Sequence, residues 1–243
     1  HRDLHSFPTR RSSDLHCATS PTIACFNNAG CPNGDCVLNT KLDGGKVISY
    51  IAHDPVGDHA TGLIKAIDGI QASAWTPWAE AYYNAIGYFA NRTDLRLQTT
   101  DFDETKNPSV DRCRLNNILI ISDGGSTADQ NATVYSTAAT YNDGDGKTDS
   151  ITAACSYAGS KNLDDLAWLA KNRSIKDFTK TPAQNSESIK TYVVYNGLPA
   201  ANTTDECLPA NLMNETAENG GTNTAYIARS EERRVGKEGR SRW

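Results

Sequence analysis

The order of strand and helix patterns between residues 116 and 228 constrains the fold more than any other feature of this chain. Asn116–Ser122 (NNILIIS) is a continuous apolar strand, and such strands are typical of parallel sheets with both faces covered. The pattern then predicts a helix from Asn162, a strand over Ser188–Asn196, a helix over Leu208–Asn219 and a strand over Thr222–Ala228. This alternation predicts an α/β fold with a parallel sheet and crossover helices.

Two further helices are expected before this strand. Apolar residues at helical spacing in Ala60–Ala72 predict a helix with one buried face. Thr76 and Pro77 are typical of a helix start, with Thr76 as the N-cap and Pro77 in the first helical position. By contrast, the Gly-, Asp- and Thr-rich segment Asp123–Gly159 is expected to be mostly loop.

The cysteine content indicates an oxidising compartment. The chain has seven cysteines, four of them within a Cys-, Asn- and Gly-rich segment that we expect to be a loop insertion held by disulfides. Paired zinc knuckles are not seen, although the Cys31–Cys36 spacing keeps a zinc site as an alternative. The odd count means that one cysteine is free or lacks its partner in this chain. We therefore expect an extracytoplasmic protein.

Both ends of the chain differ from its middle. Residues 1–15 and 229–243 are Arg-rich, have no hydrophobic period and resemble translated sequencing-adapter read-through, with disordered basic tails as the alternative. They hold nine of the 24 Lys and Arg and five of the 29 Asp and Glu, so the remainder carries 15 positive and 24 negative charges, a net charge of −9. This acidity disfavours nucleic acid and anionic membranes as partners and suits cation binding. No stretch approaches the ~20 apolar residues of a membrane span.

The ordered motifs resemble the von Willebrand factor A (vWA) domain family. Thr76, within WTPWAEA, matches the Thr-Pro-Leu-Ala-Glu-Ala pattern of that family, and Asp123 matches its strand-terminal Asp-Gly. The resemblance implies a Rossmann-like sheet with flanking helices. It also implies that Thr76 and Asp123 share an adhesion-site cation, Mg²⁺ or Ca²⁺, to which a carboxylate of a protein or host-surface ligand adds. The Asp-x-Ser-x-Ser strand of the family does not occur here, so we expect an incomplete sheet and an incomplete cation site.

Two sequence segments show a more specific resemblance, to the N-terminal part of PilC/PilY-type type IV pilus tip proteins. They are HDPVGDHATGLIKAIDGI and NLDDLAWLAKNR. This resemblance implies pilus subunits as partners and a location in the periplasm, on the outer surface or at the pilus tip of a bacterium. On this basis residues 16–58 are the Cys-rich insertion and residues 59–228 the C-terminal part of a vWA-like domain. Because the first central strand is absent, Ile118–Ile121 is expected to form an exposed apolar edge.

A second cation site is suggested by NDGDGKTD in the loop after residue 141. Asp143, Asp145 and Asp149 match positions three, five and nine of a calcium loop, with Gly146 at position six. Tyr141 stands at position one and cannot coordinate calcium as a carboxylate does. An acidic turn is therefore the alternative interpretation of this segment.

Enzyme motifs are not found in the sequence: there is no nucleophile elbow, no P-loop and no dinucleotide-binding glycine pattern. We therefore expect a cation-dependent adhesion or protein-binding module rather than an enzyme. The alternative is a structural pilus-assembly module in which the metal makes the domain rigid. An α/β hydrolase-like enzyme is the remote alternative.

Overall fold

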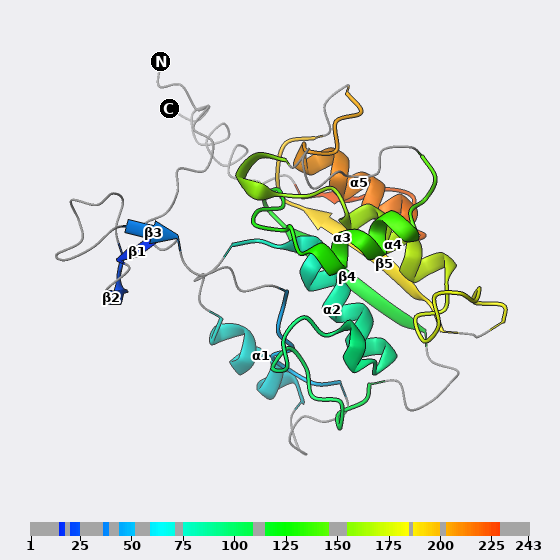
Figure 1. The fold of residues 1–243 in the computed structure, drawn as a ribbon, viewed down its shortest axis with the longest axis horizontal. Coiled ribbons are helices and arrows are strands. Elements are labelled where there is room, and N and C mark those ends of the chain that lie inside the picture. Colours follow the sequence, from blue (N-terminus) through cyan, green and yellow to red (C-terminus); the bar gives the residue numbers. More distant parts are fainter. Residues whose placement is uncertain are drawn as a thin grey trace, which may run out of the picture. The chain divides into compact units, whose positions relative to one another are not determined.

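The computed structural model describes residues 15–17, 20–24, 36–38, 44–51, 59–70, 75–108, 115–145, 155–184, 187–199 and 203–228 (Figure 1). The chain forms two compact units, each described by itself. The first unit consists of residues 1–42 and 54–76. The second consists of residues 43–53 and 77–243.

The described residues of the first unit form a small antiparallel sheet and one helix. Strands β1 (Leu15–Cys17), β2 (Ser20–Ala24) and β3 (Cys36–Leu38) pair in the order β2-β1-β3, within a segment predicted to be mostly loop. Helix α1 (His59–Asp68) confirms the predicted helix. Its apolar residues are exposed, however, so the buried face that the pattern predicts is not seen within this unit; they are Leu63, Ile64, Ile67 and, just after the helix, Ile70.

The second unit is built on a three-stranded parallel sheet. Strands β4 (Asn116–Ser122), β5 (Ile189–Tyr195) and β6 (Tyr226–Ile227) lie in the order β4-β5-β6, with Asn116 opposite Ile189 and Ser122 opposite Tyr195. The α/β class and the parallel sheet are therefore confirmed. Strand β6 is shorter than predicted because the residues before it bond elsewhere: the Thr222 N–H donates to the Ala217 carbonyl, and the Ala225 N–H to Asn214 Oδ1.

Helices precede β4 and connect the strands that follow it. They are α2 (Trp78–Ala90), α3 (Ala132–Thr140), α4 (Leu163–Asn172) and α5 (Pro209–Asn219), with short 3₁₀ turns η3 (Thr93–Leu95) and η5 (Ser156–Ala158). Helix α3 lies in the segment predicted to be loop. Asn131 begins it, because its side-chain oxygen accepts hydrogen bonds from the N–H groups of Thr133 and Val134 at 2.9 and 3.4 Å.

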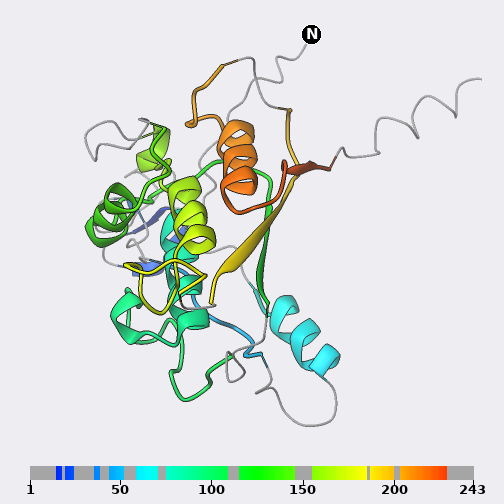
Figure 2. The same ribbon diagram turned by 90° about the vertical axis from the view of Figure 1, so that its right-hand side faces the viewer.

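The helices cover one face of the sheet. Helices α4 and α5 contact β5, and in α2 the Tyr82 hydroxyl lies 2.6 Å from Thr191 Oγ1 of β5. Figure 2 shows α4 and α5 on the same side of β4 and β5. The core between helices and sheet includes Ile86, Leu166 and Leu212, all at most 2% exposed.

The other face of the sheet is open among the described residues. Leu119 and Ile121 of β4 are 58% and 66% exposed, so the prediction of a sheet covered on both faces is wrong here. The physical reason is topological: the strands are added in one direction, and crossovers of one hand place their helices on one side. Within the described part of the chain, β4 pairs with β5 alone, which confirms the predicted apolar edge at Ile118–Ile121.

Asp129 is the buried anchor of the second unit, with 1% of its surface exposed. Its Oδ2 atom accepts hydrogen bonds from the Ala79 N–H (2.9 Å) and from the hydroxyls of Ser126 (2.5 Å) and Ser160 (2.9 Å). Its Oδ1 atom accepts the Glu80 N–H at 3.0 Å. The first N–H groups of a helix have no intrahelical partner and favour negative charge. Asp129 therefore caps α2 from a distant part of the sequence.

This remote cap corrects the predicted start of α2. The sequence pattern predicts Thr76 as the N-cap, whereas α2 begins at Trp78, its N-cap position is Pro77, and no local side chain makes the cap bond. The N–H groups that a local cap would bind are already bonded to Asp129. The tertiary contact therefore replaces the local one.

We expect Asp129→Ala to lower the free energy of unfolding by about 3 kcal/mol or more, because four buried donors lose their acceptor at about 1 kcal/mol each. Asp94→Ala is the matched control: this carboxylate pairs with Arg92 at an exposed position, and its loss is expected to cost less than about 1 kcal/mol. Urea unfolding measures both. Equal losses in the two variants would contradict the anchoring role.

The stability contribution of Asp129 should also depend on pH. Burial raises the pKa of its carboxyl despite the hydrogen bonds to Ser126, Ala79, Glu80 and Ser160, which lower it. The folded pKa therefore exceeds the unfolded value of about 4, and the contribution is complete below that value and is lost as pH rises through the folded pKa. The stability advantage of the wild type over Asp129→Asn should shrink with rising pH in denaturant titrations. An advantage that grows with pH would contradict this assignment.

Candidate metal centre

The loop after α3 is organised by its own polar side chains. The Gly144 N–H donates to Asn142 Oδ1 at 3.0 Å, and the Asp145 N–H donates to Asp143 Oδ1 at 2.9 Å. The Asp143 N–H donates to Asp165 Oδ1 at 3.2 Å, which fastens the loop to the first turn of α4. These turns place the exposed Asp145 carboxylate at the surface of the second unit.

Glu206 comes from the segment before α5. Asn211 of α5 fixes this segment by donating from Nδ2 to the carbonyls of Thr203 (2.8 Å) and Asp205 (2.9 Å). The next residue, Cys207, donates its N–H to Asp205 Oδ1 at 2.9 Å and forms a disulfide with Cys155. Glu206 is 2% exposed, so the fold holds this carboxylate in the interior.

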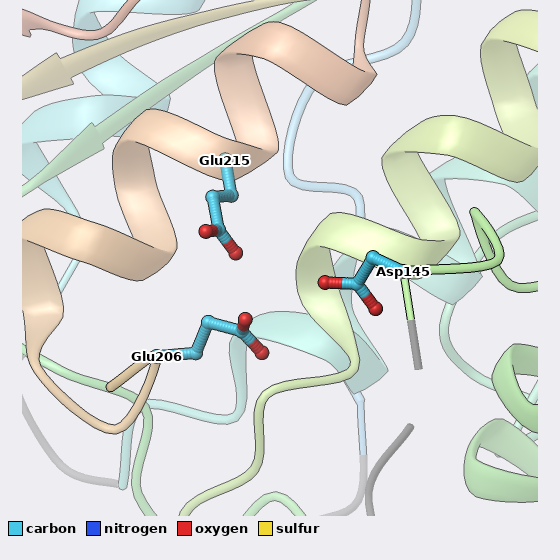
Figure 3. Close-up of side chains that lie close together, drawn as sticks. All are labelled: Asp145, Glu206 and Glu215. Carbon is cyan, nitrogen blue, oxygen red and sulfur yellow. The ribbon is translucent and has the colours of Figure 1, made fainter. Parts of the chain in front are cut away.

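Three carboxylates from separate segments converge in front of α5. Asp145, Glu206 and Glu215 each offer one oxygen, and these oxygens all lie within 4.8 Å of one another. Figure 3 shows the three side chains pointing into a common space, from the loop after α3, from the segment before α5 and from α5 itself. Three acidic groups at this spacing could hold a metal ion, because carboxylate oxygens are the ligands of hard cations.

The surroundings of the cluster are also negative. Asp164, in the first turn of α4, is 4% exposed. Burial raises the pKa of its carboxyl well above the usual range, and the charges of Asp165, Glu206 and Glu215 raise this pKa further. A cation at the cluster would oppose this repulsion.

The calcium-loop residues of the sequence prediction have different positions. Asp145 is one of the three converging carboxylates. Asp143 instead supports the loop, since its Oδ2 accepts a hydrogen bond from Asn219 Nδ2 of α5 at 2.9 Å. Asp149 lies outside the described residues, so its part in the loop stays a prediction.

The predicted adhesion pair is divided between the units. Thr76 is an exposed residue of the first unit, and Asp123 is an exposed residue of the second, directly after β4. Burial raises the pKa of the Tyr195 hydroxyl at the end of β5, and the Asp123 charge raises it further. Asp123 is thus placed at the carboxyl edge of the sheet, as predicted, while a cation shared by Thr76 and Asp123 stays a prediction.

Glu206 and Glu215 are the site residues that the sequence reasoning missed. They are nine positions apart and match no ligand spacing by themselves. The available signal was indirect: Glu206 precedes a cysteine, and a disulfide brings its segment toward distant parts of the chain. Their convergence with Asp145 depends on the packing of α5 beside α4, which local sequence does not specify.

Comparisons with protein-family models, with curated proteins and with solved structures gave no match for this chain. Among the helices of the described residues, none combines the length and the apolar character needed to cross a bilayer.

We expect Asp164→Asn to stabilise the chain in chelator at neutral pH by about 1 kcal/mol, because the amide keeps the shape and removes a carboxyl whose ionisation is opposed by burial and by the neighbouring carboxylates. Glu218→Gln, an exposed position of α5 outside the cluster, is the control and should change stability by less than about 0.5 kcal/mol. Thermal or urea unfolding in EDTA measures both. A destabilised Asp164→Asn variant would show that these charges are already balanced.

Proposed function

We propose that this chain is a calcium-dependent binding module of a bacterial protein that acts outside the cytoplasm. The observation that supports this most strongly is the convergence of Asp145, Glu206 and Glu215 from three segments. In this proposal the bound cation neutralises the cluster and holds the loop after α3 against α5. The loops around the cation then present a fixed surface to a protein or host-surface partner.

Calcium fits this cluster better than magnesium. Mg²⁺ requires a near-ideal octahedron and keeps several waters, whereas Ca²⁺ takes oxygen ligands in a flexible arrangement. The three carboxylates come from a loop, an irregular segment and a helix, and Ca²⁺ tolerates such an irregular set of ligands.

An extracytoplasmic location is supported by the Cys155–Cys207 disulfide, because structural disulfides persist in oxidising compartments. The two segments similar to PilC/PilY-type pilus tip proteins favour the same compartment. They also favour pilus subunits or a host surface as partners. We also propose that the chain belongs to the vWA family. The parallel sheet and its flanking helices are consistent with this assignment.

The adhesion component of the proposal uses Asp123. This carboxylate is exposed at the end of β4, and ligand sites of open α/β sheets lie at the carboxyl ends of the strands. A second cation held there would take a carboxylate of the partner as its last ligand. The cluster around Glu206 would then serve as the structural cation site of the same domain.

Calorimetric titration of the chain with CaCl₂ tests the proposal. We expect the Asp145, Glu206 and Glu215 cluster to bind calcium with a Kd on the order of 10⁻⁴ M, typical of extracellular calcium modules, and to bind magnesium more weakly. Glu206→Gln should raise the Kd at least about tenfold, whereas the matched control Glu218→Gln should leave it unchanged. Absence of calcium binding by the wild type, or equal binding by Glu206→Gln, would refute the cation site.

The structural pilus-assembly function is the second candidate, and the buried position of Glu206 favours it, because a buried cation stabilises a fold. The two functions differ in cells that express the whole protein. Asp123→Ala should abolish surface adhesion and leave pilus number unchanged if the domain binds a ligand directly. If Glu206→Gln lowers pilus number while Asp123→Ala changes neither property, the assembly function is correct instead.

A further inference from the structure

The cation cluster and the disulfide share a segment of the chain. Cys207 directly follows Glu206, and its partner Cys155 lies ten positions after Asp145. The bridge closes a sequence separation of 52 residues, and the Cα atoms of the two cysteines are 5.2 Å apart. The disulfide therefore joins the segment that carries Glu206 to a cysteine ten positions after Asp145.

Cys155 is itself fixed to the buried anchor of the unit. It begins a turn over residues 155–159, closed by the Cys155 N–H bonding to the Gly159 carbonyl at 3.2 Å. The Tyr157 and Ala158 carbonyls of this turn accept the N–H groups of Ala128 (3.0 Å) and Asp129 (2.8 Å). The disulfide thus connects the Glu206 segment to the loop that caps α2.

Glu206 depends on such a restraint because its segment holds a carboxylate in the interior. The side chain is 2% exposed, and one of its oxygens lies within 4.8 Å of an oxygen of Asp145 and an oxygen of Glu215. A segment free to move would carry this carboxylate toward water, where its charge is better solvated. Rebinding a cation would then require the segment to be ordered again, which lowers affinity.

We propose that the Cys155–Cys207 disulfide controls the affinity of the cation site, so that its reduction releases the cation. This inference rests on the proposed function. In the reaction the S–S bond breaks, a dithiol donates two electrons and two protons, and the dithiol is itself oxidised to a disulfide. Cys155 and Cys207 become thiols. Both cysteines are partly exposed, so a thiol reductant can reach the bridge.

The coupling works in both directions. If the disulfide strengthens cation binding by a given factor, the cation strengthens the disulfide against reduction by the same factor. A disulfide far from the ligands would stabilise the fold, but it would not change the calcium Kd, and calcium would not change its resistance to reduction. The two effects are measured by independent methods and must agree.

The first measurement is the calcium Kd of the oxidised chain and of the double variant Cys155→Ser/Cys207→Ser, by calorimetry. We expect the Kd of the double variant to be at least about tenfold higher. Circular dichroism of the variant at the titration temperature verifies that it is folded. Equal Kd values overturn the inference and leave the proposed function intact, whereas no binding by the oxidised wild type overturns both.

The second measurement uses the wild-type chain and needs no variant. The chain is equilibrated with dithiothreitol buffers of graded redox ratio, with saturating calcium or with chelator, and the Cys155–Cys207 peptide is quantified by mass spectrometry after alkylation. Calcium should shift the midpoint toward more reducing buffer by the factor found in the Kd ratio. A midpoint that calcium does not move would overturn the inference.

Discussion

The rest of the second unit depends on the hydrogen bonds between the Asp129 carboxyl group and the first turn of α2. It places a carboxyl group in the interior, and it holds that group with two backbone N–H groups and two serine hydroxyls. The loop that carries Asp129 also bonds to the 155–159 turn, and the disulfide extends this connection to Glu206. These contacts connect the Asp129 cap of α2 to the segment that carries Glu206 of the candidate metal centre.

The candidate metal centre has the opposite electrostatic character. Around Asp129 the donors surround one carboxylate, whereas around Asp164 the neighbours include three further carboxylates. Buried like charges of this kind destabilise a fold unless a cation or protons compensate them. The proposed calcium ion gives this arrangement a physical reason: the repulsion that weakens the cation-free chain is what would make cation binding favourable and fold-stabilising.

The sequence predicted those parts of the fold that local patterns determine. Strand β4 agrees with the prediction over Asn116–Ser122, because a continuous apolar run has few alternatives, and α5 differs by one residue at its start. Helix α3 was missed because its Thr- and Ala-rich sequence has no clear apolar period, and its start depends on the Asn131 cap. Asp145 was found through its loop motif. Glu206 and Glu215 were not, because only tertiary packing and a disulfide bring them to Asp145.

The central claim is that one cation lies between Asp145, Glu206 and Glu215. Anomalous diffraction from crystals grown in CaCl₂, at a wavelength where calcium scatters anomalously, tests it most directly. The account predicts a peak within about 2.3–2.6 Å of an oxygen from each of the three side chains. A map in which this space contains no anomalous peak, while the crystals hold calcium elsewhere on the chain, would contradict it.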